Sequence, residues 1–88
     1  MTEATIKLTN PAGLHARPAA QLVQKAASFA SKVKISANNK VADAKSILSV
    51  MGMGLACGTE IVITADGEDE KECIAALIAL IKGNFGEA

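Results

Sequence analysis

Residues 10–20, Asn-Pro-Ala-Gly-Leu-His-Ala-Arg-Pro-Ala-Ala, separate an alternating segment before them from an alanine-rich segment after them. This stretch contains the only histidine and the only arginine of the chain, His15 and Arg17, together with both prolines. Proline and glycine favour a loop here. A proline is also accepted in the first turn of a helix, because its missing N–H would have no partner there. The stretch therefore predicts a loop that runs into a helix, with His15 at or just before the helix start.

His15 and Arg17 put an imidazole and a guanidinium close to this predicted helix start. The first backbone N–H groups of a helix are unpaired and the helix dipole is positive there, so the position favours an anion. Together these groups form a candidate site for a phosphoryl group carried on histidine. Composition alone does not decide this, since a lone histidine near a helix start is more often an ordinary surface or capping residue.

Length and composition indicate one domain over residues 1–88. Half of the residues are apolar, but Trp and Tyr are absent and Phe29 and Phe85 are the only aromatic residues, so we expect an aliphatic core. No apolar run approaches the roughly 20 residues that cross a bilayer, and the N-terminus does not resemble a signal peptide. We therefore expect a cytoplasmic protein without membrane insertion.

The charged residues are balanced in number and uneven in distribution. Nine basic and nine acidic side chains give zero formal charge, which argues against a nucleic acid partner. Residues 1–45 carry seven basic and two acidic side chains, whereas residues 46–88 carry two and seven. Because His15 lies in the basic half, we expect partners with acidic surfaces and salt-sensitive association. Alternatively, the two halves mix in the fold and the asymmetry disappears.

The two cysteines, Cys57 and Cys73, have neither metal-ligand spacing nor a Cys-x-x-Cys pattern. We expect free, buried thiols in a reducing compartment, although a disulfide stays open at this point. The sequence contains no glycine-rich nucleotide loop and no His/Cys cluster. No cofactor and no metal ion are therefore expected.

Four segments are predicted as strands, and they lie at residues 4–8, 33–37, 40–43 and 60–65. The pair Asn38-Asn39 between the second and third is typical of a tight hairpin turn, because asparagine tolerates positive φ. The fourth segment, Glu-Ile-Val-Ile-Thr-Ala, is rich in β-branched residues and is expected at the centre of the sheet.

Three segments are predicted as helices. Apolar residues recur at helical spacing up to about Ala30 in the first, whose start would be Pro18 on propensity. Ser46 is a good N-cap for a short second helix that ends at Gly52 and Gly54. The third begins near Asp69 or Glu70, with a stop at Gly83 and a buried stripe of Ile74, Leu77, Ile78 and Ile81. The order β-α-β-β-α-β-α indicates an α+β fold, a four-stranded, mostly antiparallel sheet with helices on one face.

Residues 13–19, Gly-Leu-His-Ala-Arg-Pro-Ala, resemble the active-site signature of HPr, the histidine-containing phosphocarrier family of the phosphoenolpyruvate:sugar phosphotransferase system. Similar runs occur at residues 45–47, 50–51, 58–59 and 67–70, so the resemblance spans nearly the whole chain. It implies the open-faced β-sandwich of that family. It also implies a first helix that begins nearer Ala16, which leaves the amides of Ala16 and Arg17 free to cradle phosphate.

By this resemblance, His15 accepts a phosphoryl group on Nδ1 from phosphorylated enzyme I and passes it to IIA domains of sugar transporters. Arg17 neutralises the charge of the moving group. The protein is then expected to be a monomeric carrier that partner enzymes phosphorylate and dephosphorylate, and not itself an enzyme. Two alternatives remain: an HPr-type paralogue in a nitrogen or other regulatory phosphorelay, and a binding module that is not phosphorylated.

Ser46 corresponds to a serine that HPr kinase/phosphorylase modifies in Gram-positive relatives, where the product binds a catabolite repressor. Residues 46–54 resemble this regulated type but depart from it at Ser49 and Gly52, which tend to be a glycine and a serine there. Regulatory phosphorylation of Ser46 is therefore our interpretation, next to its role as an N-cap.

Ile47, Leu48 and Met51 are spaced so that they share a helix, and the ordinary interpretation is that all three are core residues. In so short a helix some of them must point outward. The family uses this patch, together with the His15 turn, for docking. We therefore expect the three side chains to supply apolar contacts to several partners.

Overall fold

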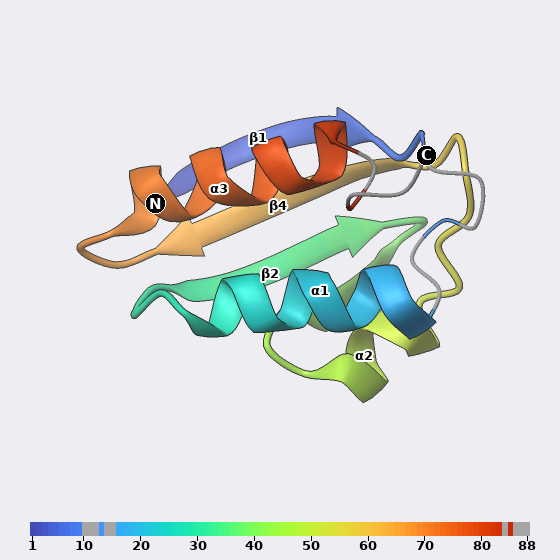
Figure 1. The fold of residues 1–88 in the computed structure, drawn as a ribbon, viewed down its shortest axis with the longest axis horizontal. Helices are drawn as coiled ribbons and strands as arrows, with labels where there is room; N and C mark the ends of the chain where they lie inside the picture. The colour runs from blue at the N-terminus through green and yellow to red at the C-terminus, as the bar shows by residue number, and fades with distance from the viewer. Residues whose placement is uncertain (10–12, 14–15, 84, 86–88) are drawn as a thin grey trace.

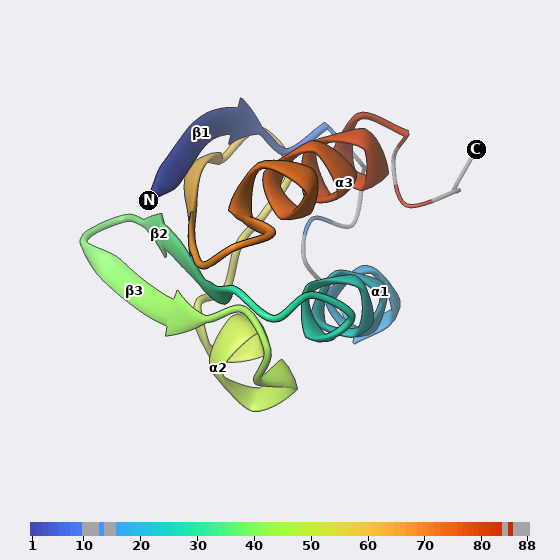
Figure 2. The same cartoon turned by 90° about the vertical axis from the view of Figure 1, so that its left-hand side faces the viewer.

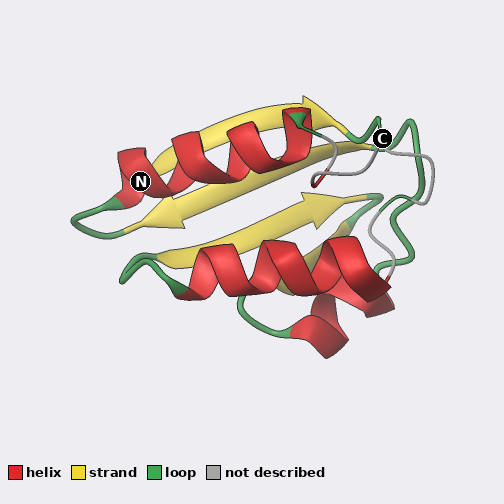
Figure 3. Cartoon of the chain, in the orientation of Figure 1, coloured by secondary structure: helices red, strands yellow, loops and turns green. Residues whose placement is uncertain are grey.

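The computed structural model describes residues 1–9, 13, 16–83 and 85 (Figure 1). The elements follow the predicted order, and their bounds are β1 (Thr2–Lys7), α1 (Ala16–Ala27), β2 (Lys32–Ala37), β3 (Lys40–Asp43), α2 (Ile47–Gly52), β4 (Glu60–Asp66) and α3 (Glu70–Lys82). Figure 3 shows the sheet and helices as separate layers. The α+β class is thus confirmed.

The four strands form one sheet in the order β1-β4-β2-β3, and every neighbouring pair is antiparallel. β4 lies between β1 and β2, with Ile63 opposite Ala4 on one side and Ile35 on the other. This confirms the expected central place of the β-branched strand. The β2–β3 hairpin turns at Asn38 and Asn39, whose φ angles of 52° and 63° are the left-handed values that asparagine tolerates.

All three helices cover the same face of the sheet, as Figure 2 shows. Alternate strand side chains face them, and β4 contributes Ile61, Ile63 and Ala65, which are completely buried. The helices pack their apolar stripes against these strand side chains, and the stripes include Leu22 of α1 and Leu77 of α3. Each fully buried aliphatic side chain contributes about 1.5–3 kcal/mol to folding, so this layer holds the site-bearing loops in place.

α1 ends at Ala27 and not near Ala30 as the apolar spacing predicts. The amides of Ser28 and Phe29 donate to carbonyls three residues back, which tightens the last turn. The amides of Ala30 and Ser31 then turn to the Asp69 carboxylate, at 2.7 Å and 3.0 Å. A partner from another element therefore ends the helix, and Ala30 is exposed.

Residues of opposite charge occupy opposite positions on neighbouring strands. The register sets Lys7 opposite Glu60, Lys32 opposite Asp66 and Lys34 opposite Asp43. The basic and acidic halves of the sequence therefore mix in the sheet. On the helical side, α1 carries only basic charges, Arg17 and Lys25, whereas α3 carries two acidic and two basic residues.

Candidate functional site

The start of α1 lies at one end of the molecule, close to the end of β1, the start of β4 and the end of α3 (Figure 1). α1 begins at Ala16, as the resemblance implies, and not at Pro18, as propensity alone predicts. Ala16 and Arg17 are exposed, whereas Pro18 and Ala19 are buried. His15 lies outside the described residues and directly precedes Ala16 in the chain.

Leu8 and Gly13, which precede His15 in the sequence, contact the segment that leads into β4. The Leu8 amide donates to the Thr59 carbonyl at 2.9 Å, and the Gly58 amide donates to the Leu8 carbonyl at 2.7 Å. Gly13 is buried with a φ of +64°. A methyl group built on it would lie 2.4 Å from the Leu55 carbonyl oxygen and 2.7 Å from the Ala56 Cα atom. Only a glycine fits so close to another backbone.

Ser46 is the N-cap of α2, as predicted. Its hydroxyl accepts a hydrogen bond from the Ser49 amide at 3.4 Å, and its carbonyl accepts one from the Val50 amide at 3.0 Å. Ser46 is half-buried, and its own amide donates to the Asp43 carbonyl. The hydroxyl thus stands at the first turn of α2, where the unpaired amides favour added negative charge.

The three residues expected for docking are exposed on α2. Leu48 is 82% exposed, Met51 42% and Ile47 36%, whereas Val50 is fully buried and anchors the helix. The core interpretation of these residues is therefore wrong. α2, which carries this apolar patch, packs against α1 (Figure 2).

The two cysteines are free thiols in different environments. Cys73 of α3 is buried, as expected, and burial raises the pKa of its thiol, with the nearby Asp69 carboxylate adding to the effect. Cys57, in the connection between α2 and β4, is exposed, contrary to expectation. Its thiol donates to the Thr9 carbonyl oxygen at 3.7 Å.

Sequence reasoning missed a carboxylate cluster at the opposite end of the molecule. Asp69, the residue before α3, accepts hydrogen bonds from the Ala30 and Ser31 amides and from the Ser31 hydroxyl. The bond from the Ser31 hydroxyl is the main reason that the pKa of Asp69 is lowered. Glu70 accepts from the Thr2 hydroxyl, which likewise lowers the pKa of Glu70. Thr2 and Glu70 lie 68 residues apart in the sequence, so no local pattern reveals their hydrogen bond.

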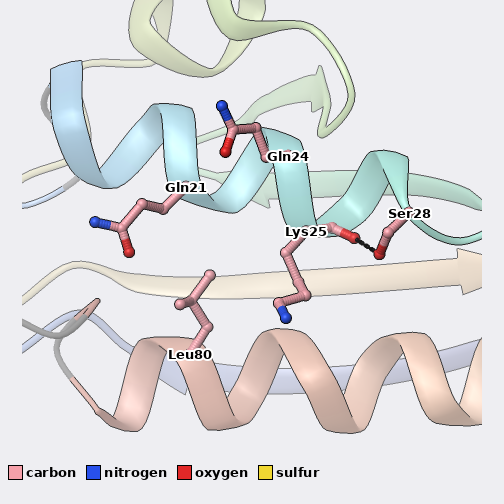
Figure 4. Close-up of a pocket in the computed structure, with 5 residues that line it drawn as sticks. All are labelled: Gln21, Gln24, Lys25, Ser28 and Leu80. Atoms are coloured by element: carbon pink, nitrogen blue, oxygen red, sulfur yellow. Dashed lines mark hydrogen bonds between the residues drawn. The ribbon is translucent and has the colours of Figure 1, made fainter.

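A polar cleft of about 370 Å³ runs between α1 and α3 (Figure 4). Its lining comprises Gln21, Gln24 and Lys25 of α1, Ser28, and Leu80 of α3. Figure 4 shows Gln21 and Lys25 extending toward α3, where Leu80 faces them. The Ser28 hydroxyl donates to the Lys25 carbonyl at 2.6 Å. Among the described residues, none of the site residues predicted from the sequence lines this cleft.

The described part of the chain contains neither a cluster of metal ligands nor a membrane-spanning helix. Across residues 1–9, 13, 16–83 and 85, no three His, Cys, Asp or Glu side chains gather as metal ligands. No helix in these ranges combines the length and the apolar character that crossing a membrane requires.

Comparison with known proteins agrees with this geometry. The family model described as "PTS HPr component phosphorylation site" matches residues 2–83. A phosphocarrier protein HPr from Cupriavidus necator is 44% identical over 87 residues, which cover 99% of this chain and 98% of the relative. A crystal structure of HPr from Thermoanaerobacter tengcongensis superposes with a TM-score of 0.97 at 45% identity, covering 100% of this chain and 99% of that one.

A second crystal structure from Thermoanaerobacter tengcongensis, described as an HPr dimer, matches with a TM-score of 0.80 at 46% identity and covers 99% of this chain and 100% of its own. The family model, the full-length relative and both structures lead to one conclusion. The chain belongs to the HPr family, the phosphocarrier proteins of the phosphotransferase system.

Proposed function

We propose that this protein relays a phosphoryl group on His15 from phosphorylated enzyme I to the IIA components of sugar transporters. One observation carries the proposal: the Gly-Leu-His-Ala-Arg-Pro-Ala motif runs directly into the start of α1, where Ala16 and Arg17 are exposed. A helix start with accessible amides and a guanidinium suits a doubly charged phosphoryl group. The whole chain acts as one phosphocarrier domain in the cytoplasm, as a monomer.

The transfer is a displacement at phosphorus. The lone pair of the His15 Nδ1 atom attacks the phosphoryl group held on the enzyme I histidine, so one N–P bond forms while the other breaks. The same exchange then delivers the group to the IIA component. A neutral imidazole is nucleophilic near physiological pH, and its phosphoramidate stays reactive enough to hand the group on. The Ala16 and Arg17 amides cradle the group, and the Arg17 side chain offsets its charge.

We assign docking to the exposed patch of Ile47, Leu48 and Met51 beside the start of α1. Exposed apolar side chains next to a phosphorylated residue let partners bury surface while they bring their own histidine into line. Methionine adapts its shape to different partners, which suits a carrier that serves a donor and several acceptors. The basic charges of α1 favour partners with acidic surfaces.

We further propose that Ser46 is a regulatory phosphorylation site for HPr kinase/phosphorylase, and that the modified protein binds a catabolite repressor. The cap position supports this, because phosphate at the start of α2 is stabilised by unpaired amides. The added charge of nearly −2 would lie beside the apolar patch and repel acidic partners of the relay. Phosphorylation would thus favour one set of partners and weaken the other.

The carrier role is tested by intact mass after incubation with phosphoenolpyruvate and enzyme I. We expect one added phosphoryl group that acid removes and that is absent from His15→Ala. Replacement of enzyme I by the donor of a nitrogen-branch phosphorelay separates the sugar pathway from a regulatory paralogue. A folded protein that gains no mass with either donor would be a binding module and would refute the relay.

The regulatory role is tested separately with ATP and HPr kinase. We expect one acid-stable phosphoryl group that is absent from Ser46→Ala, whereas His15→Ala still gains it. Light scattering of the unmodified protein checks the monomer, since one solved relative is a dimer. No mass gain at Ser46 would leave that serine with its capping role alone.

A further inference from the structure

β1 is an edge strand whose outer side has no partner among the described strands. The sheet order β1-β4-β2-β3 leaves β1 paired with β4 on one side only. A free edge carries backbone N–H and C=O groups that can pair with another strand. β1 contains no proline, and each of its 6 residues has a register partner on β4, so no bulge twists this edge away.

Three alternate residues of β1 carry the outward backbone groups. In an antiparallel strand, the N–H and C=O of one residue point to the same side, and those of the next residue point to the other side. The Leu8 amide donates at 2.9 Å to the Thr59 carbonyl of the segment that leads into β4, so Leu8 points toward β4. By alternation, the N–H and C=O groups of Glu3, Thr5 and Lys7 point away from β4.

The side chains of these three residues fit a second β1 strand related by a twofold axis at Thr5. All three are exposed, and in an antiparallel pair centred on Thr5, Glu3 of each copy lies opposite Lys7 of the other. Opposed residues of opposite sign stabilise such a pair, and like charges destabilise it. Charges on an edge usually prevent pairing, but this spacing makes them complementary. A parallel pair in register would set like charges together, so the pattern selects one closed arrangement.

The inner side of β1 also has apolar surface left to cover. Ala4 and Ile6 face the core but are only half-buried, whereas their register partners on β4, Ile63 and Ile61, are completely buried. The antiparallel pair centred on Thr5 would set Ala4 of one copy opposite Ile6 of the other. Burial of this surface favours the pair.

Helix α3 would meet its counterpart in the same arrangement. It packs on both β1 and β4 (Figure 1), and neighbouring strands lie about 4.8 Å apart, so the two α3 axes would lie roughly 10 Å apart, within the packing distance of helices. Leu80 faces α1, and residues two apart on a helix point in nearly opposite directions. The half-buried Ile78 therefore points away from α1 and adds apolar surface to the contact.

We propose that β1 is a self-association edge, at which two copies of this chain pair antiparallel through Glu3, Thr5 and Lys7 and join their sheets into one. The inference does not rest on phosphoryl transfer. β1 and β3 are opposite edges of the sheet, and α2 packs against β3 and α1 (Figure 2). The docking patch on α2 therefore stays free, and the monomer proposed for the relay is in equilibrium with the pair.

Sedimentation equilibrium of the full chain measures the pairing and its charge dependence. A short edge buries little surface, so we expect a Kd of roughly 0.1–1 mM. Glu3→Lys and Lys7→Glu each set like charges opposite each other twice, and each should raise the Kd about tenfold. The double variant that combines them should return it to within about threefold. Lys40→Glu, on the exposed start of β3, changes the net charge as Lys7→Glu does and should leave the Kd within about twofold.

Amide hydrogen exchange at low and high protein concentration reads the backbone register. The amides of Glu3, Thr5 and Lys7 should gain protection as the pair forms, whereas those of Ala4 and Ile6, which point toward β4, should change little. Thr5→Pro removes an outward N–H and leaves the ladder with β4 intact, so it should abolish pairing in a folded monomer.

Three results would overturn the inference. The first is a chain that stays monomeric up to about 2 mM, well above the expected Kd. The second is association that Glu3→Lys and Lys7→Glu leave unchanged, since it would belong to another surface. The third is subunit exchange between labelled and unlabelled pairs that is as slow as unfolding, because this would show strand swapping and not edge pairing.

Discussion

Replacing Ser31 by alanine tests the carboxylate cluster that joins α1, β2 and α3. Ser31 is fully buried, and its hydroxyl donates to the Asp69 carboxylate. Hydrogen bonds to charged groups contribute about 1.5–3 kcal/mol, and the partial exposure of Asp69 places this one toward the lower end. We therefore expect Ser31→Ala to lose roughly 1–2 kcal/mol of unfolding free energy, or about 4–8 °C in Tm for each kcal/mol.

The pH dependence of this loss identifies its cause. The pKa of Asp69 is lowered in the folded protein, chiefly by the Ser31 hydroxyl. A carboxylate with a lowered folded pKa stabilises the fold above its unfolded pKa, and this contribution is lost as the pH falls through the folded pKa. The difference between the unmodified protein and Ser31→Ala should thus be largest near neutral pH and shrink as the pH falls below the ordinary carboxyl pKa of 3.8 and through the lowered pKa of Asp69. The pKa of Glu70 is also lowered, chiefly by the Thr2 hydroxyl, but Glu70 is common to both proteins, so its contribution cancels in the difference.

Urea unfolding, followed by circular dichroism at about pH 7 and about pH 3, measures this difference. Ser28→Ala is the matched control, because the Ser28 hydroxyl is exposed and donates to the neutral Lys25 carbonyl. We expect Ser28→Ala to cost no more than about 0.5 kcal/mol at either pH. Equal losses for the two variants, or a Ser31→Ala loss that is the same at both pH values, would refute the role of the charged hydrogen bond.

Three other predictions concern the surface of the molecule. Met51→Asp should weaken binding of enzyme I by roughly fivefold, about 1 kcal/mol, and leave urea unfolding unchanged, because Met51 is exposed. Val50→Asp should instead unfold the domain, because Val50 is fully buried. Titration calorimetry measures the binding of Met51→Asp, and a loss of folding in that variant would contradict the prediction. Cys57 should react with a thiol reagent in the native protein and Cys73 only on unfolding, and equal native rates would contradict their burial. The association rate with enzyme I should fall by roughly tenfold between about 0.01 M and 0.15 M salt, and a flat response would exclude electrostatic steering.

The sequence predicted those features that depend on neighbouring residues. Alternating apolar and polar residues located the strands, Asn38-Asn39 located the hairpin, and Ser46 located the start of α2. Each of these features is set by interactions within a few residues of the sequence. The motif at residues 13–19 likewise pointed to the candidate site. The resemblance of this motif to the HPr signature also predicted that α1 begins at Ala16 and not at Pro18.

Features that depend on distant residues were beyond such patterns. α1 stops at Ala27 because backbone amides after it bind Asp69, which lies 38 and 39 residues away in the sequence. The exposure of Cys57 depends on which side of residues 53–59, between α2 and β4, faces Thr9. The close approach of Gly13 to Leu55 arises only when β1 and β4 pair. Each follows from tertiary packing, which composition and spacing do not encode locally.

The arrangement separates stability from phosphoryl chemistry along the length of the sheet. Asp69 and Ser31 join three elements at one end, whereas the start of α1 and the start of β4 lie at the other (Figure 1). The antiparallel strands of the sheet run between the two ends. A carrier that docks with several proteins can therefore adapt the exposed side of α2 while the far cluster keeps the fold intact. Gly67→Ala, which would place a methyl group 2.7 Å from Cα and Oγ of Ser31, should therefore lower stability and leave the rate of phosphoryl transfer unchanged.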